Sequence, residues 1–348
     1  MDVRILDLDG SVSVQTSLVL QTRAFVRPAR DWGPRVRLAC RFAQFDAFQR
    51  DLADRLGSAV DGGPTVTFVG SGDFHHVSLA LLRRQTGPFN LLVLDKHPDW
   101  MRGVALLHCG TWLNHAARLP LARHVFHAGG DVDFDNAYRW LAPWDLLRAG
   151  RLRVLPAVRS FRSGRWAGIQ HEPLRRHPEA PVTPERMDEL LCPYRNDLAR
   201  WPLYVSVDKD VMRSADAAVN WDSGLLELCE ATVILDAFRR AANGELAGMD
   251  LVGDWSPVEV SGAFRRVLHW IEHPSLAVDP DAACWLNERT NLALLAAAGA
   301  VQPPRVPDRA PVFHKGGAAV AGPHRPATDR ETASGQPKVA HDDVAEYE

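Results

Sequence analysis

The sequence has few of the features that mark secreted, membrane-spanning or nucleic-acid-binding proteins. No apolar run approaches ~18 residues, and the N-terminus opens with Asp2, Arg4 and Asp7 rather than a basic segment followed by an apolar one. The formal net charge of -3 comes from interspersed acids and bases, with no long basic block. The cysteines are scattered, odd in number and form no C-x-x-C pair: Cys40, Cys109, Cys192, Cys229 and Cys284. We therefore expect a cytoplasmic protein with no nucleic-acid or membrane partner, no disulfide scaffold and no zinc ribbon.

The sequence does have enough apolar residues, 46%, for a sizeable core. Short β-branched or leucine-rich runs alternate with helical stretches rich in Ala, Leu and Arg, a pattern typical of βαβ units. The expected strands are Val3–Leu8, Thr65–Val69, Leu91–Leu94, His124–His127, Leu152–Leu155, Leu203–Val207 and Ala247–Val252. The expected helices are Phe45–Arg55, Val77–Arg84, Trp112–Arg118, Pro184–Leu191, Glu230–Asn243 and Ser261–Glu272. The predicted fold is α/β, with three layers and a mostly parallel central sheet flanked by helices.

Composition also suggests how the chain is divided. Residues 1–300 carry the strand and helix pattern and are expected to form one domain. Residues 160–195 are rich in Arg, His and Pro without a clean period, and are expected to be an insertion near the mouth of the site. Residues 301–348 have almost no large apolar side chains, so they cannot offset the entropy of ordering, and we expect a mobile, disordered tail.

Two short segments rich in metal ligands follow expected strands. Asp95, His97 and Asp99 come after one strand, and Asp208 and Asp210 come at the end of another. Residues two apart in extended chain project to the same side, and the carboxyl ends of parallel strands are where open α/β sheets keep their active sites. Four carboxylates and an imidazole gathered there would repel one another without a cation. The pattern therefore predicts a site for two divalent metal ions.

A third segment adds an imidazole. The turn Gly70-Ser71-Gly72-Asp73-Phe74-His75-His76 lies between the expected strand at 65–69 and an apolar helix, and its glycines permit a tight bend. Either His75 or His76 can be the ligand.

Together the three segments resemble the arginase/agmatinase ureohydrolases, which carry G-G-D-H, D-A-H-x-D and S-x-D-x-D after successive strands. The match spans about residues 3–300 but is specific only at these motifs. The resemblance implies an arginase-like fold, two Mn²⁺ ions or other divalent metals, and hydrolysis of a guanidino group. It also implies the ligand sets. The histidine of the first motif, Asp95, Asp99 and Asp208 would hold one ion, while His97, Asp95, Asp208 and Asp210 would hold the other.

Several positions depart from the family pattern. Phe74 is one residue too many in the first motif, and Lys96 and Lys209 replace small or apolar residues within the other two. Trp100-Met101-Arg102 stands where amino-acid-processing members have an asparagine that holds the substrate carboxylate, which argues against free arginine. The chain is more similar to a divergent branch whose members include enzymes acting on arginine side chains within peptides. We therefore expect a guanidino small molecule or an arginine-containing peptide as substrate; an oligomer is compatible with the sequence.

Three residues are candidates for catalysis. In the expected reaction, two ions about 3.5–4 Å apart activate a shared water for attack on the guanidinium carbon. Asp99 would move the proton to the leaving amine. His108 lies where the family places a loop histidine that relays protons or contacts substrate, although a purely structural role is equally compatible. Asp254, after the strand at 247–252, approximately matches the family position that holds the guanidinium, a role that suits a carboxylate.

The leading hypothesis is thus a binuclear manganese amidinohydrolase that releases urea. Two alternatives remain open from the sequence. One is a zinc-dependent, deacetylase-like amide hydrolase on the same fold. Such an enzyme binds a single zinc ion through one Asp, one His and another Asp, and this sequence has Asp99 and Asp210 in addition to such a set. The other is a non-catalytic relative that binds metal or a partner.

Overall fold

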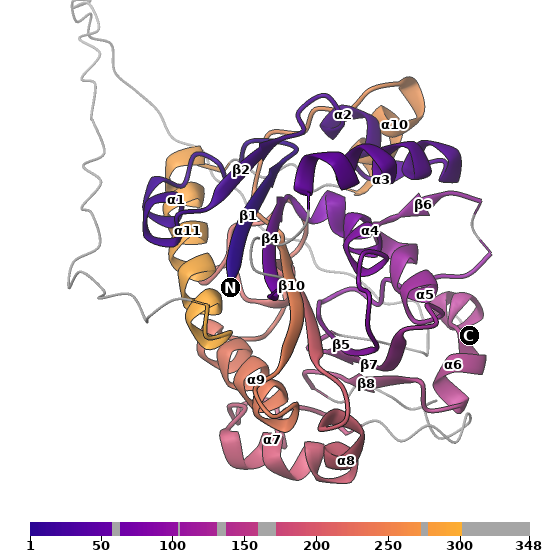
Figure 1. Cartoon of the computed structure of the whole chain (residues 1–348), viewed down its shortest axis with the longest axis vertical. Coiled ribbons are helices and arrows are strands. Elements are labelled where there is room, and N and C mark those ends of the chain that lie inside the picture. Colours follow the sequence, from indigo (N-terminus) through magenta and orange to yellow (C-terminus); the bar gives the residue numbers. More distant parts are fainter. Residues whose placement is uncertain (58–62, 104, 131–136, 159–171, 273–277, 301–348) are drawn as a thin grey trace, which may run out of the picture. The chain divides into compact units, whose positions relative to one another are not determined.

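Eight parallel strands form the central sheet (Figure 1). The computed structural model describes residues 1–57, 63–103, 105–130, 137–158, 172–272 and 278–300, all within one compact unit. In sheet order the strands are β2 (Phe25–Pro28), β1 (Asp2–Asp7), β4 (Thr65–Gly70), β10 (Leu246–Val252), β9 (Leu203–Asp208), β5 (Phe89–Leu94), β7 (Ala122–Ala128) and β8 (Leu152–Leu155). Every adjacent pair is parallel. The predicted mostly parallel sheet is confirmed, and each expected strand is present.

The expected strands are found because their residues are buried. All six residues of β5 and of β9 are buried, and strands covered on both faces have near-continuous apolar sequences. β2 was not predicted from the sequence, since it lies at the sheet edge with Phe25 and Val26 exposed. A second, two-stranded antiparallel sheet joins β3 (Ala39–Cys40) to β6 (Leu107–His108) and was also not predicted.

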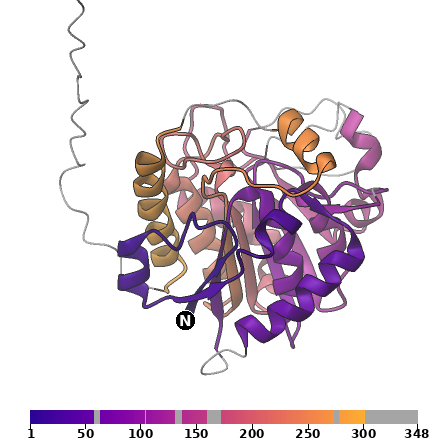
Figure 2. The same cartoon turned by 90° about the horizontal axis from the view of Figure 1, so that it is seen from above.

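Helices cover both faces of the sheet, giving the expected three layers. One apolar core includes residues of α1 (Thr16–Thr22), α7 (Pro184–Leu191), α8 (Arg195–Leu198), α9 (Leu228–Ala241) and α11 (Pro280–Ala297). The other includes residues of α2 (Gly33–Val36), α3 (Phe42–Leu56), α4 (Ser78–Leu82), α5 (Trp112–Ala116) and α6 (Trp144–Arg148). Figure 2 shows α1 and α11 on one side of the sheet and α3 on the other. The remaining long helix is α10 (Ala263–Glu272), which is tied to β3 by the bond that Arg265 Nε donates to the carbonyl of Ala39.

Part of the expected insertion is ordinary core structure. α7 begins behind a Thr183 cap, whose side chain accepts from the backbone N–H of Arg186. Met187 and Leu190 of this helix are buried in the same core as α9. Residues 159–171 of the expected insertion and the expected tail at 301–348 lie outside the described residues.

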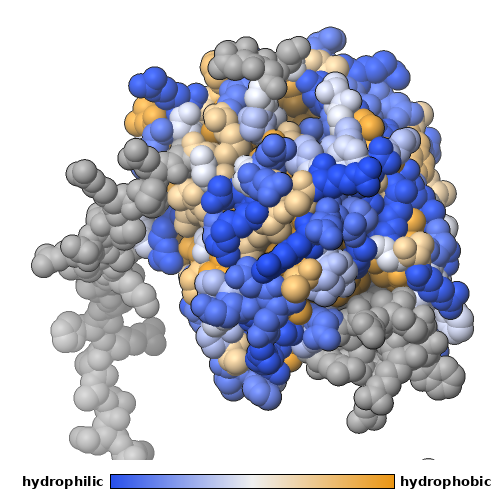
Figure 3. All heavy atoms as spheres, turned by 60° about the horizontal axis from the view of Figure 1, so that its bottom comes forward, coloured by the Kyte–Doolittle hydropathy of each residue, from blue (hydrophilic) through white to orange (hydrophobic). Residues whose placement is uncertain are grey.

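The described surface is mixed in character. In Figure 3, hydrophilic side chains are interspersed with apolar ones over the face shown, which is ordinary for a protein surface. Within the described ranges, no helix combines the length and apolar character that a membrane span needs.

Candidate metal centre

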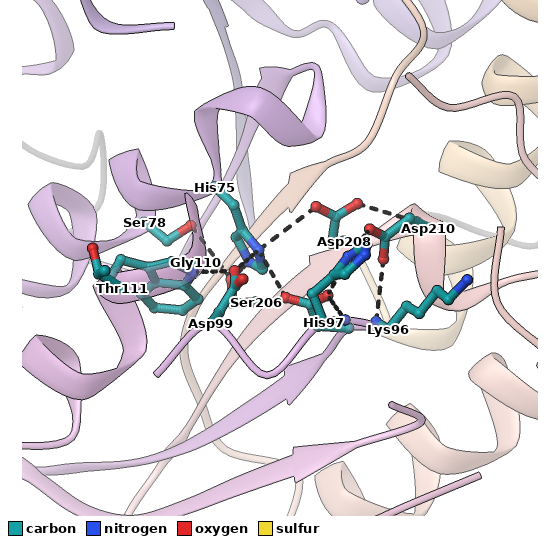
Figure 4. A network of polar contacts seen from close by, with 12 residues as sticks. His75, Ser78, Lys96, His97, Asp99, Gly110, Thr111, Ser206, Asp208 and Asp210 are labelled. Atoms are coloured by element: carbon teal, nitrogen blue, oxygen red, sulfur yellow. Dashed lines mark hydrogen bonds and ion pairs between the residues drawn. The ribbon is translucent and has the colours of Figure 1, made fainter. Parts of the chain in front are cut away.

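The three sequence motifs meet at one edge of the sheet (Figure 4). His75 lies in a 3₁₀ turn, Gly72–Val77, that directly follows β4. Asp95 and its neighbours follow β5, and Asp208 ends β9. β5 and β9 are neighbours in the sheet, while β10 separates β9 from β4. The carboxyl ends of three strands therefore bring together side chains from segments that are far apart in the sequence.

One half of the cluster is built around His75. Its Nδ1 lies 3.1 Å from Asp95 Oδ2, 3.0 Å from Asp99 Oδ2 and 3.6 Å from Asp208 Oδ2. Nevertheless His75 Nδ1 and Asp95 Oδ2 are buried without hydrogen-bond geometry to any partner. The other ring nitrogen, Nε2, lies 3.0 Å from Ser206 Oγ and is thus already engaged. Carboxylate oxygens that converge on an imidazole nitrogen without hydrogen-bond geometry are an arrangement that a cation satisfies.

The other half is built around His97. Its Nδ1 lies 2.8 Å from Asp210 Oδ2 and 4.0 Å from Asp95 Oδ1. Ligand atoms of Asp95, His97 and Asp210 lie within 4.8 Å of one another, as do those of His75, Asp95 and Asp99. Asp95 belongs to both groups, and it offers a different oxygen to each histidine. The cluster is therefore two half-sites that share a carboxylate.

Two glycines make room for Asp208. A Cβ atom on Gly72 would lie 2.7 Å from Asp208 Oδ2, and one on Gly253 would lie 2.5 Å from Asp208 Oδ1. The same Oδ1 accepts a hydrogen bond of 3.1 Å from the backbone N–H of Asp210. The carboxylate is thus held between two backbone segments that approach closely because neither has a side chain.

Charge at the cluster is poorly balanced without cations. Burial raises the pKa values of Asp95, Asp208 and Asp210, and a neighbouring carboxylate raises each further. Burial disfavours protonated His75 and His97, yet the adjacent carboxylates raise the pKa of both histidines well above the usual value. Divalent ions would displace these protons and take over the same ligand atoms.

His76, the alternative ligand in the first motif, lies outside this cluster. Its ring is completely buried, with its centroid 6.2 Å from that of Phe45. Burial lowers the pKa of His76 to about 3, so the ring is neutral at pH 7. Of the two histidines left open by the sequence, the structure places His75 in a group of side chains that could hold a metal ion.

Asp99 is held in an uncommon conformation. Its φ is +51°, in the left-handed region that Asp tolerates better than most residues. Trp112 Nε1 donates a hydrogen bond of 2.7 Å to Asp99 Oδ2, and the backbone N–H of Leu113 donates to the Asp99 carbonyl. Asp99 therefore has a fixed direction at the cluster.

His108 lies in β6 and forms the cap of the turn that leads to α5. Its Nδ1 accepts a hydrogen bond of 3.1 Å from the backbone N–H of Gly110. Burial lowers the pKa of His108 to about 4, which leaves the ring neutral at pH 7 with its remaining proton on Nε2. His108 is absent from both groups of ligand atoms.

Asp254 is not brought to the cluster. Its Oδ1 lies 2.8 Å from Lys209 Nζ and accepts a hydrogen bond of 2.7 Å from Gln15 Nε2. The side chains of Lys209 and Asp254 are 0% and 1% exposed. This geometry does not support the predicted contact between Asp254 and a substrate guanidinium, because the carboxylate is buried and already faces a cation.

Asp222 lies beside the cluster but was not predicted from the sequence. Asp222 Oδ1 lies 3.5 Å from His97 Nε2, and Asp222 Oδ2 forms an ion pair with Lys96 Nζ. Asp222 lies in a loop without a repeating pattern, so no local signal in the sequence connects it to His97. Only the path of the 212–226 loop places it there.

Known proteins share this architecture. No family model matches the chain. An uncharacterised protein of Thermotoga maritima is 25% identical over 195 residues, which cover 56% of this chain and 60% of that protein's length. The arginase of Bacillus cereus superposes with a TM-score of 0.50, at 10% identity, over 86% of this chain and 98% of that one. The chain has an arginase-like fold. Proclavaminate amidinohydrolase of Streptomyces clavuligerus is similar at a TM-score of 0.49 and 16% identity, over 86% and 92% of the two chains.

The arginase-like fold confirms the architecture implied by the sequence motifs. At such low sequence identity, the comparison supports a shared fold and nothing beyond it. What the chain does therefore has to be argued from its own cluster of ligands.

Proposed function

We propose that the chain is a binuclear, manganese-dependent amidinohydrolase that releases urea from a guanidino group, including that of an arginine residue in a peptide. The observation that carries this proposal is the pair of half-sites that share Asp95. Two groups of ligand atoms that share a carboxylate can hold two ions close enough to act on one water.

The residues fit such ions. The ligand atoms are carboxylate oxygens and imidazole nitrogens, a set that suits Mn²⁺. Two of them, His75 Nδ1 and Asp95 Oδ2, are buried without hydrogen-bond geometry to any partner. In the proposed site His75, Asp95, Asp99 and Asp208 hold one ion, and His97, Asp95, Asp208 and Asp210 hold the other. When bound, a pair of divalent ions lowers the pKa of a shared water and polarises the substrate.

The chain's own residues direct the proton. In this proposal, Asp99, with its direction fixed by Trp112, accepts a proton from the attacking water and passes it to the leaving amine. In the same proposal His108, whose ring is neutral at pH 7, contacts the substrate.

The proposal is tested by metal content and product release together. The full chain would be purified with Mn²⁺, its metal stoichiometry measured, and urea and ornithine assayed with free arginine, agmatine and arginine-containing peptides. We expect two ions per chain and urea release from at least one substrate. Two bound ions with no product from any substrate would refute the function but not the metal site.

A matched pair of variants sharpens the test. Asp208→Ala removes a carboxylate from both half-sites, so we expect fewer than two bound ions and no turnover. Asp236→Ala removes a carboxylate from α9, where Asp236 pairs with Arg239 and Arg240, and should change neither quantity. Two ions retained by Asp208→Ala would show that the ligand assignment is wrong. One zinc ion per chain and acetate release from an acetylated amine would favour the deacetylase-like alternative instead.

A further inference from the structure

The two histidines of the cluster are supported in very different ways. His75 Nε2 lies 3.0 Å from Ser206 Oγ, which donates a hydrogen bond of 2.8 Å to Asp250 Oδ1. Ser78 Oγ donates a second bond of 2.7 Å to the same oxygen. All four residues are buried. The orientation of His75 is thus fixed by a chain of hydrogen bonds that water does not reach.

His97 is supported from the solvent side. Its side chain is 34% exposed, and its Nε2 faces Asp222 Oδ1 at 3.5 Å. Asp222 is itself 66% exposed and is held by the ammonium group of Lys96. Asp222 therefore lies between the imidazole of His97 and the ammonium group of Lys96.

The loop that carries Asp222 is fastened to the cluster. Lys96 Nζ also donates to the carbonyl of Ser223 at 2.9 Å. The backbone N–H of Gly224 donates to the carbonyl of Asp210 at 2.6 Å. Trp221 lies edge-on to the His97 ring, with 5.5 Å between ring centroids, and its Nε1 donates to Asp73 Oδ1. Asp222 is therefore placed beside His97 by several independent contacts, although its own carboxylate is exposed.

We propose that Asp222, held by Lys96, is a positioning residue for His97 and sets how tightly the second half-site binds its ion. This inference rests on the two-ion site of the proposed function. A metal-bound histidine usually donates its other N–H to a carboxylate or carbonyl, and loss of that partner typically weakens metal binding about 10–100-fold. Asp222 fills this place for His97 as Ser206 does for His75.

Unequal ion binding follows from the difference in burial. An exposed carboxylate and ammonium are screened by salt, whereas a buried hydrogen-bond chain is not. The ion at His75, Asp95 and Asp99 is then the tighter one, and the ion at His97 and Asp210 is the labile one. Raising the ionic strength weakens the second ion more than the first.

The test is a titration of the metal-free full chain with Mn²⁺. Isothermal calorimetry gives the two affinities, and electron paramagnetic resonance distinguishes single from paired Mn²⁺. Asp222→Asn and Lys96→Met should weaken the more weakly bound ion, Asp222→Asn by about 10-fold or more, and leave the tighter ion unchanged. Ser206→Ala should do the reverse. Asp236→Asn, an equivalent change on α9, should affect neither ion, and thermal unfolding checks that every variant is folded.

Each outcome has a clear meaning. Equal weakening of both ions by Asp222→Asn, or no weakening of either, would overturn the positioning role, even if the wild type hydrolyses a guanidino compound. Selective weakening in a protein that releases no urea would support the positioning role and refute the proposed function. A chain that binds no Mn²⁺ would overturn both.

Discussion

Replacing Lys209 by methionine should destabilise the metal-free protein by about 3 kcal/mol or more. Lys209 is completely buried, and its ammonium group lies 2.8 Å from Asp254 Oδ1. Breaking a buried ion pair by removing one partner typically costs about 3–5 kcal/mol, because the other charge is left buried without compensation. Methionine keeps most of the side-chain volume, so the charge is the main change.

The contacts around Lys209 and Asp254 narrow the range of the expected loss of folding free energy. At an effective dielectric constant of about 20, two charges 2.8 Å apart attract by about 6 kcal/mol, and the desolvation of both groups offsets much of this. After the substitution, Asp254 still accepts hydrogen bonds from Gln15 at 2.7 Å and Asn291 at 3.2 Å. These donors partly compensate the remaining charge, which places the expected loss near the lower end of the range.

A double-mutant cycle separates the ion pair from packing. Unfolding by urea would be followed for Lys209→Met, for Asp254→Asn and for the combination, with metal removed so that ion binding does not contribute. We expect the combined variant to lose at least 1 kcal/mol less than the sum of the single losses, because it leaves no unpaired buried charge. Strict additivity, or a loss below about 1 kcal/mol for Lys209→Met, would refute the reasoning.

Three further predictions concern the cluster and its surroundings. Trp112→Phe removes the hydrogen bond to Asp99, so kcat should fall about 10-fold with both ions retained, as measured by steady-state kinetics and metal analysis. Gly72→Ala places a methyl group 2.7 Å from Asp208 Oδ2 and should lower bound metal, whereas Gly87→Ala, which meets nothing within 4 Å, should not. Burial lowers the pKa of His76 to about 3, below its unfolded value of about 6.5. Its contribution to stability is therefore full above pH 6.5 and is lost on acidification toward pH 3. In acid denaturation of the metal-free protein, His76→Leu should flatten that pH dependence.

Local sequence patterns predict the buried strands well and the remaining elements less well. β5 and β9 were predicted because burial on both faces leaves a continuous apolar run. α11 was not predicted, although Asp279 caps it by accepting from the backbone N–H groups of Asp281 and Ala282. Its buried face includes Asn287, Thr290 and Asn291, so burial there does not follow the apolar spacing by which an amphipathic helix is recognised.

The same limit applies to the site. That the three motif segments meet could be predicted because their strands end at the same edge of the sheet, whereas the choice between His75 and His76 needed the structure. Asp222 could not be predicted, since it reaches His97 through the path of a loop. The sequence likewise gives no sign that Lys209 and Asp254, which lie 45 positions apart by their numbers, form a buried ion pair. Such pairings depend on how loops and strand ends pack in three dimensions.

The position of Asp254 follows from the sheet order. β10 lies between β4, which leads to His75, and β9, which carries Asp208, so the Asp208 side chain must reach across the end of β10. A Cβ atom on Gly253 would lie 2.5 Å from Asp208 Oδ1 and 2.6 Å from the backbone nitrogen of Lys209, and Gly253 has a φ of +92°. A side chain cannot occupy this point without displacing the Asp208 carboxylate. The first acid after β10 is Asp254, one residue beyond this glycine. Its backbone N–H donates to the carbonyl of Gly70, and its carboxylate faces the ammonium group of Lys209. The close approach of Asp208 to His75 and to the backbone at Gly253 thus explains why β10 supplies space to the cluster rather than a charge.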